Sequence, residues 1–263
     1  MAREETDYRP INEDQVRATA ESGQGFDGVL FGASLVLDDI DFGESRFERC
    51  LFAVPAIRGA DFARATFKDC RFAPTRFANC IFARAKFDGC TLFDVEQKKG
   101  CTFAFCDLEA AEATKCNFAT GSFERCDLYN LNAVECSFRG AIFTKSSFTK
   151  TLSRRSSLTK ASFDHCNLSF ADLSELHLQG ASFLSCKFSE ASLIDTDLSE
   201  ATMIACTLDR VEWERARLRR ADLRGSRLPG LNLAVLADYA GLVISESEQS
   251  DLLRQLGIDV RAE

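Results

Sequence analysis

The sequence predicts an all-β fold in which four-sided coils of parallel strands stack along one axis. A large apolar residue recurs every five positions through most of the chain, and a small residue stands two positions before most of these centres. A period of five fits neither an α-helix nor a strand, so it indicates a repeat architecture. One large and one small inward residue describe one side of a square coil, and successive coils would pair as parallel ladders about 4.8 Å apart.

The central residues of the repeats fall into two trains. Most centres are phenylalanine, so the aromatic residues belong to the predicted core. The first train comprises Phe42, Phe47, Phe52, Ile57, Phe62, Phe67, Phe72, Phe77, Phe82, Phe87 and Leu92. The second comprises Phe103, Leu108, Phe118, Phe123, Leu128, Phe138, Phe143, Phe148, Phe163, Leu168, Phe183, Phe188, Trp213, Leu223 and Leu233.

This pattern resembles the pentapeptide-repeat family over about Phe42 to Leu233. The resemblance implies a right-handed quadrilateral parallel β-helix. We expect one elongated domain, because repeat proteins grow lengthwise. Its repeats would cover residues 26–233, between an N-terminal leader or capping segment (1–25) and a C-terminal helix and tail (234–263).

The composition suits a chain that buries a sizeable core. Of its 263 residues 46% are hydrophobic and 27% charged, and the net charge is −8. No apolar run approaches the length of about eighteen residues that a membrane helix needs. The polar start, MAREETDYRPINEDQ, lacks the apolar segment of a secretory signal. We therefore expect a cytoplasmic protein with no membrane partner.

The twelve cysteines stand at the small positions of the repeats. The closest pair, Cys101 and Cys106, is five residues apart, and no CxxC occurs, so the usual zinc spacings are missing. Buried free cysteine acts as a small hydrophobic residue. We predict that the thiols pack in the core, with no metal and no cofactor.

The positions of the cysteines also predict a projecting loop. The centres jump from Leu92 to Phe103, which fits either two repeats with one bulged residue or one repeat with six residues looped out. With six residues removed, eleven cysteines lie on two facing sides, and Cys166, Cys186 and Cys206 fall on the same side as Cys80. The bulge would scatter the cysteines, so we predict a loop within 93–100.

A second irregular stretch is TKTLSRRSSLTK, residues 149–160, where the polar Ser153 takes a central position. A polar residue at a core position packs poorly. This stretch is a candidate second loop. The cysteine positions do not decide the question, because removing ten residues would only exchange the two cysteine-bearing sides.

Both ends of the chain depart from the repeat. NEDQVRATAESG could form a short helix that ends at Gly23 and covers the exposed ladder edge, or the segment could be a disordered leader. Near the C-terminus, Ser245 and Glu248 match a capping box before a short apolar helix. We expect this end to form a homodimer through residues Leu252, Leu253, Leu256, Ile258 and Val260.

No constellation of residues suggests catalysis, so we do not expect an enzyme. His165 and His177 take outward positions, and phosphate-binding loops and hydrolase motifs are missing. The charge argues against direct nucleic-acid binding, because a net charge of −8 repels phosphate. The possible exception is the cluster of Arg210, Arg215, Arg217, Arg219, Arg220, Arg224 and Arg227.

Two segments are similar to the quinolone-resistance (Qnr) group of pentapeptide-repeat proteins. FDGCTLFDVEQKKGCTF, residues 87–103, is similar to the group's first projecting loop, and QSDLLRQLGIDV, residues 249–260, to its C-terminal dimerisation helix. The resemblance implies a DNA mimic that binds DNA gyrase or topoisomerase IV and protects it from quinolones. The expected contact is Phe93, Asp94, Val95, Glu96, Gln97, Lys98, Lys99 and Gly100. The alternative is a non-catalytic interaction scaffold with an unrelated partner.

Overall fold

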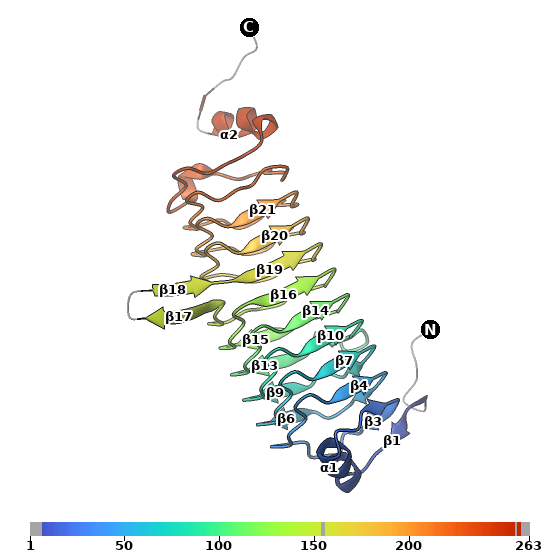
Figure 1. The fold of residues 1–263 in the computed structure, drawn as a ribbon. Helices are drawn as coiled ribbons and strands as arrows, with labels where there is room; N and C mark the ends of the chain where they lie inside the picture. Colours follow the sequence, from blue (N-terminus) through green and yellow to red (C-terminus); the bar gives the residue numbers. More distant parts are fainter. Residues whose placement is uncertain (1–6, 154–155, 256, 259–263) are drawn as a thin grey trace.

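The computed structural model describes residues 7–153, 156–255 and 257–258. The chain winds into a right-handed quadrilateral parallel β-helix of about ten turns, which confirms the predicted fold class (Figure 1). We number the four sides of the coil in chain order, beginning with the side of Phe47. Side 2 then contains Phe52, side 3 Ile57 and side 4 Phe62.

Side 1 forms the longest ladder, and the other sides are shorter or held by isolated bridges. The strands of side 1 are β2 (Phe26–Asp27), β4 (Arg46–Glu48), β7 (Thr66–Lys68), β10 (Lys86–Asp88), β14 (Glu112–Thr114), β16 (Leu131–Val134), β19 (Ala161–Asp164), β20 (Ser182–Leu184) and β21 (Thr202–Ile204). Side 2 has β1 (Arg9–Pro10), β3 (Val29–Phe31), β5 (Leu51–Phe52) and β8 (Arg71–Phe72). Side 3 has β6 (Ala56–Arg58), β9 (Arg76–Ala78), β13 (Thr102–Ala104) and β15 (Ser122–Glu124).

Two antiparallel hairpins interrupt the coils. Across the first, β11 (Phe93–Asp94) and β12 (Lys99–Gly100), Phe87 pairs with Ala113 instead of residue 107. Six residues are therefore looped out, and the alternative bulge does not occur. Across the second, β17 (Thr149–Ser153) and β18 (Ser156–Thr159), Ala133 pairs with Phe163 instead of residue 153, so ten residues are looped out.

The second hairpin corrects the predicted placement of three cysteines. Ten residues are two sides of a coil, so Cys166, Cys186 and Cys206 move to the side of Cys50 and Cys136. The Cys166 Sγ donates to the Ala133 carbonyl at 3.4 Å and Ser137 pairs with Asn167, so Cys136 and Cys166 are neighbours in successive coils. Eight cysteines therefore share one column: Cys50, Cys70, Cys90, Cys116, Cys136, Cys166, Cys186 and Cys206.

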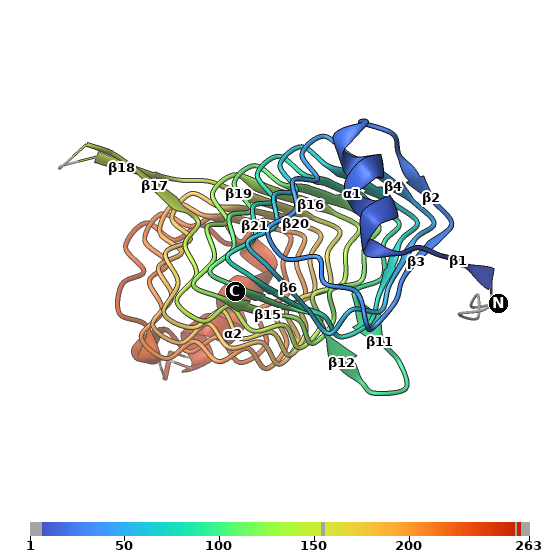
Figure 2. The same ribbon diagram turned by 90° about the horizontal axis from the view of Figure 1, so that it is seen from below.

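The N-terminal end is closed by helix α1 (Glu13–Glu21), which lies across the first coil (Figure 2). Asn12 and Gln15 form a capping box at its start, and Val16 is buried in the core. Strand β1 joins the side 2 ladder by pairing with β3, so the ladder includes residues before position 26.

The C-terminal end corrects the predicted capping box. The ladder continues to Val243, followed by the 3-10 helix η3 (Glu246–Glu248) and helix α2 (Gln249–Gln255); a further 3-10 turn, η2, spans Leu233–Val235. Ser245 makes no side-chain hydrogen bond to η3. Instead, its Oγ accepts a 2.8 Å hydrogen bond from the Gly225 N–H, and Glu248 Oε2 accepts one of 3.1 Å from the Leu228 N–H.

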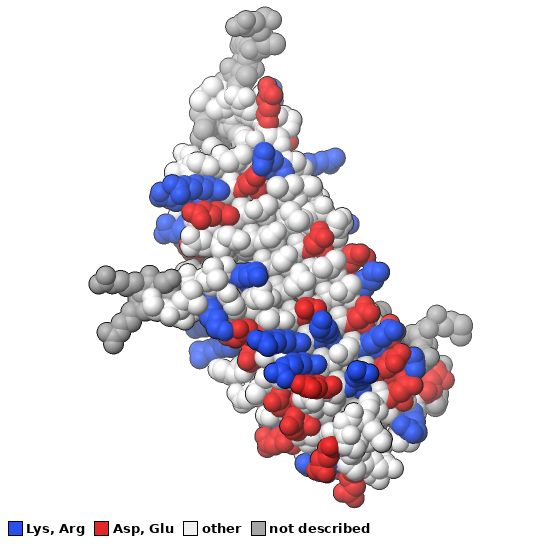
Figure 3. Space-filling model, viewed as in Figure 1, with Lys and Arg blue, Asp and Glu red and all other residues white. Residues whose placement is uncertain are grey.

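The outer surface carries charges of both signs, interleaved over the visible face (Figure 3). At many corners of the coil a non-glycine residue has a positive φ, as at Glu44 and Arg64. Corner residues in successive coils stack, so opposite charges can pair. Arg64 and Glu44 are 2.6 Å apart.

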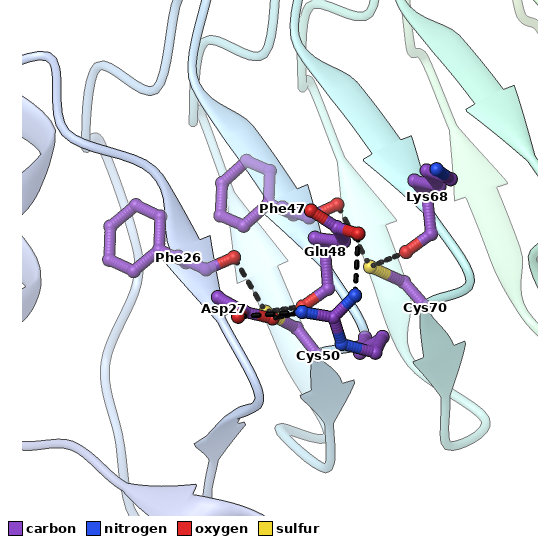
Figure 4. A network of polar contacts seen from close by, with 8 residues as sticks. Phe26, Asp27, Phe47, Glu48, Cys50, Lys68 and Cys70 are labelled. Atoms are coloured by element: carbon purple, nitrogen blue, oxygen red, sulfur yellow. Dashed lines mark hydrogen bonds and ion pairs between the residues drawn. The ribbon is translucent and has the colours of Figure 1, made fainter.

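In the core, most of the thiols are hydrogen-bonded to the backbone of their own and the preceding coil (Figure 4). The Cys50 Sγ donates to the Phe26 carbonyl at 3.3 Å, and the Cys70 Sγ donates to the Phe47 carbonyl at the same distance. All twelve cysteines are free and buried, as predicted. Phenylalanine rings stack beside them: the centroids of Phe47 and Phe67 are 4.8 Å apart at 6°.

Candidate functional site

The first hairpin stands at the corner between sides 2 and 3, after Leu92 and before Phe103. Its strands pair Phe93 with Gly100 and Asp94 with Lys99. The Cys101 N–H donates to the Leu92 carbonyl at 3.0 Å, which closes the base of the hairpin. The hairpin is therefore a defined projection from a rigid coil.

The tip of the hairpin is ordered by its own side chains. Asp94 Oδ1 accepts a 2.8 Å hydrogen bond from the Gln97 N–H, and Lys98 adopts a left-handed turn conformation with φ +52°. Val95 is 74% exposed, which is high for an aliphatic side chain. The tip thus presents one apolar group among charged ones.

Gly100 fixes where the hairpin returns to the coil. A Cβ atom at this position would lie 2.4 Å from the Ala119 carbonyl oxygen and 2.7 Å from the Gly121 nitrogen. Both neighbours are backbone atoms of the next coil, so they cannot move aside without distorting that coil. Only glycine fits this contact.

The hairpin forms one wall of a surface groove of about 470 Å³. Phe93, Asp94, Val95 and Glu96 line the groove from the hairpin. The floor and the opposite wall come from side 2, with Leu51, Ala53, Arg71, Phe72, Ala73 and Thr91. The sequence analysis did not identify these side 2 residues. The period of twenty residues per coil could have indicated them, because it stacks positions 51, 71 and 91.

The second hairpin projects from the corner between sides 4 and 1, on the opposite side of the rod from the first (Figure 2). Its Lys150 Nζ lies 2.5 Å from Glu109 Oε1 and 5.5 Å from the Tyr129 ring centroid. These contacts tie the hairpin to side 4. Residues 154 and 155 lie outside the described part of the chain.

Side 4 carries a row of aspartates in its N-terminal half: Asp41, Asp61, Asp107 and Asp127. Each accepts a hydrogen bond from the backbone N–H two residues later, as between Asp107 Oδ1 and the Glu109 N–H at 2.8 Å. Burial raises the pKa of Asp127, and the carboxylates of Asp107 and Glu109 raise it further. These aspartates thus stabilise the turns of side 4 and also form an acidic strip on it.

The C-terminal arginine cluster is largely engaged within the chain. Arg210 pairs with Glu190, and Arg215 with Asp195, each one coil away. Arg219, Arg220 and Arg224 also have carboxylate partners. Most of the cluster therefore forms ion pairs within the chain and is not a free basic patch.

The predicted dimerisation residues have different surroundings. Leu252 is 5% exposed and packs in the core of its own chain, so in this arrangement its side chain is not available to a second copy. Leu253 is partly buried and Ile258 is 50% exposed. Leu256 and Val260 lie outside the described residues.

His165 lies at an exposed corner beside Asp164, and His177 is also on the surface. No group of three or more His, Cys, Asp or Glu side chains in the described ranges is arranged to hold a metal ion. Neither helix of the described chain has the length and apolar character needed to cross a bilayer.

Comparisons with known proteins agree with this architecture. A model described as "Pentapeptide repeat region" matches residues 156–233, and one described as "Pentapeptide repeats (8 copies)" matches residues 57–93 and 122–152. No curated protein sequence matches the chain significantly.

Solved structures share the fold at low sequence identity. Full-length QnrB1, described as a plasmid-mediated fluoroquinolone resistance protein, aligns with a TM-score of 0.64 and 21% identity over 89% of this chain and 100% of its own. HetL from the cyanobacterium Nostoc sp. strain PCC 7120, described as involved in heterocyst differentiation regulation, aligns with a TM-score of 0.52 and 15% identity, over 89% and 92% of the two chains. Both likenesses establish the fold alone.

Proposed function

Because the chain belongs to the pentapeptide-repeat family and has a Qnr-like fold, we propose that it binds a type II topoisomerase and protects the enzyme from quinolones or similar poisons. The partner would be DNA gyrase or topoisomerase IV, in the cytoplasm. The protein would act by binding, without catalysis.

One observation carries this proposal: a hydrogen-bonded hairpin projects from a solenoid that matches QnrB1 over the whole length of QnrB1. The hairpin offers an exposed Val95 between charged neighbours, and the groove beside it could receive a partner's side chains. An exposed apolar group rimmed by polar residues is typical of a protein-binding site.

The charge distribution favours hairpin contacts over mimicry of duplex DNA along the whole rod. The side 4 aspartates supply four carboxylates over five coils of about 4.8 Å each, because Ile81 takes the equivalent position in one coil. Duplex DNA carries one charge per roughly 1.7 Å of its axis. The row therefore reaches less than about a third of that density, and neighbouring basic residues reduce it further. Mimicry would be confined to this acidic strip.

The test is rescue of gyrase supercoiling in the presence of ciprofloxacin, with a deletion that preserves the coil. Removing residues 94–99 joins Phe93 to Gly100 and restores the spacing of five between Leu92 and the next centre, Phe103. Gly100 would then occupy a corner position, where positive φ is common and glycine is favoured. We expect the native protein to restore supercoiling and this variant to lose most of the effect.

A matched control removes the second hairpin. Deleting residues 150–159 restores the spacing of five between Phe148 and Phe163, and equal unfolding temperatures would show that both variants are folded. Absence of rescue by the native protein at any concentration would refute topoisomerase protection. Rescue that survives loss of the first hairpin would instead refute the assigned contact.

The alternative is an interaction scaffold with an unrelated partner. The match to HetL, whose described role is in heterocyst differentiation regulation, supports it, because the same fold serves another role there. Capture of partners from native lysate distinguishes the two: recovery of gyrase subunits favours the first proposal, and recovery of another protein without them favours the scaffold.

A further inference from the structure

A second groove, of about 660 Å³, runs along the corner between sides 4 and 1, below the base of the second hairpin. Figure 3 views this side of the molecule and shows basic side chains gathered there. The groove is lined by Arg64, Arg84, Lys86, Ala110, Glu112, Asn130, Leu131, Asn132, Lys160 and Ser162. Four cationic side chains thus surround one carboxylate.

The hollow arises from a change of side-chain size at stacked corner positions. Arg64, Arg84, Ala110 and Asn130 occupy equivalent corners of four successive coils, each with a positive φ. The long side chains of Arg64 and Arg84 fill the space at their corners. The short side chains of Ala110 and Asn130 leave the space at theirs open. Lys160 closes the other end, where the chain returns from the second hairpin.

Two of the four cations that line the groove are engaged in ion pairs, and the other two are not. Arg64 pairs with Glu44 at 2.6 Å and Lys86 with Glu112 at 3.1 Å. Arg84 and Lys160 have no carboxylate partner within the described residues. Their backbones lie three coils apart, which is about 14 Å at 4.8 Å per coil. A single small anion would therefore reach only one of these two unpaired cations, which mark the two ends of the binding stretch.

We propose that this groove binds a chain of phosphates, as in inorganic polyphosphate or a nucleoside triphosphate. Arginine and lysine bind phosphate oxygens through charge-assisted hydrogen bonds, and the Asn130, Asn132 and Ser162 side chains add neutral donors between the two ends. The lining contains no aromatic residue, so it offers no stacking surface for a base. The groove thus recognises the phosphate chain, and this proposal does not depend on a topoisomerase partner.

Charge density favours a chain of phosphates over an acidic peptide as the ligand of this groove. An extended peptide presents same-face carboxylates about every 7 Å, which places few of them between the two ends. Duplex DNA is disfavoured because the adjacent side 4 carries the aspartate row. Poly-glutamate and duplex DNA therefore serve as competing ligands in the test.

The test is calorimetric titration of the full chain with tripolyphosphate and with ATP, at low and at physiological salt. We expect one tripolyphosphate per chain, weakened about tenfold in the double variant R84N/K160Q, a loss of about 1.4 kcal/mol. The control K115N/K145Q removes the same charge from exposed positions outside the groove lining and should stay within about twofold. ATP binding like tripolyphosphate would identify nucleotides as a source, and weaker ATP binding would favour inorganic polyphosphate.

A third variant tests the hollow itself. Ala110→Glu places a carboxylate in the groove, and the fold accepts glutamate at such corners, as at Glu44, Glu135 and Glu175. We expect this folded variant to lose tripolyphosphate binding. Three outcomes would overturn the proposal: no binding of either ligand, equal weakening in the control variant, or tighter binding of poly-glutamate or duplex DNA through the same residues.

Discussion

At the scale of single residues, cysteine combines two properties that this coil needs. It is small enough for the inward position beside a stacked phenylalanine, and its thiol donates to carbonyl oxygens, as from Cys50 to Phe26. Ser226 extends the same column one coil further, with its Oγ donating to the Met203 carbonyl at 2.6 Å. Alanine also occupies such inward positions, as at Ala65, but it makes no such hydrogen bond.

The buried thiols predict that stability falls at alkaline pH. Burial raises the pKa of the Cys101 thiol to about 12, against an ordinary value near 9. Below pH 9 both states keep the proton, so this thiol has no effect on the pH dependence. Between pH 9 and 12 the unfolded chain releases the proton first, and unfolding becomes easier, by about 2–3 kcal/mol for this thiol at pH 11.

Urea unfolding under reducing conditions, measured from pH 7 to 11, checks this prediction. Cys101→Ala should lower stability at pH 7 but lose less stability than the native chain between pH 9 and 11. An identical pH dependence in the two proteins would show that the Cys101 thiol is not protected from ionisation.

At the scale of elements, the ends of the rod show how a local motif can be used for a different contact. Ser245 and Glu248 have capping-box spacing, yet they bind the N–H groups of Gly225 and Leu228, twenty residues earlier in each case. The last coil has no following coil to accept these donors. The Ser245 and Glu248 side chains therefore accept the hydrogen bonds that the carbonyl groups of a further coil would otherwise accept.

Removing these two caps should loosen the last coil. Each of Ser245→Ala and Glu248→Ala should cost about 0.5–2 kcal/mol, because a backbone donor loses its partner. Hydrogen exchange at the Gly225 and Leu228 amides should accelerate, while exchange at the Phe67 amide in the centre of the rod stays unchanged. Unchanged exchange at the last coil would mean that water replaces the two side chains without cost.

The period of five made the coil and its core predictable from the sequence, because each repeat has the same inward residues. The first hairpin was predictable from cysteine positions for the same reason. The side of Cys166 was predicted wrongly, since a ten-residue loop changes the side without changing the pattern. Contacts between coils, such as Arg64 with Glu44, depend on side chains twenty or more residues apart, and the five-residue pattern does not select them.

At the scale of the whole molecule, the two ends of the rod have different surfaces. The outer face of α1 is polar, with Asp14, Gln15 and Arg17 exposed. The C-terminal end instead exposes apolar groups: Tyr239 at 45%, Val243 at 41% and Ile258 at 50%. Of the two ends, the C-terminal one is the better candidate for assembly, since exposed apolar surface favours association.

We therefore predict a two-fold homodimer through the C-terminal end, with Leu253 and Ile258 in the contact and Leu252 retained inside each chain. A two-fold contact would cover the apolar groups of both copies at once. Light scattering after size-exclusion chromatography should give twice the chain mass for the native protein and the single-chain mass for L253E/I258E. The control V95E alters an even more exposed aliphatic residue on the first hairpin and should stay dimeric. A native protein that elutes with the mass of one chain at high concentration would contradict the dimer, and the apolar C-terminal end would then have to meet a different partner.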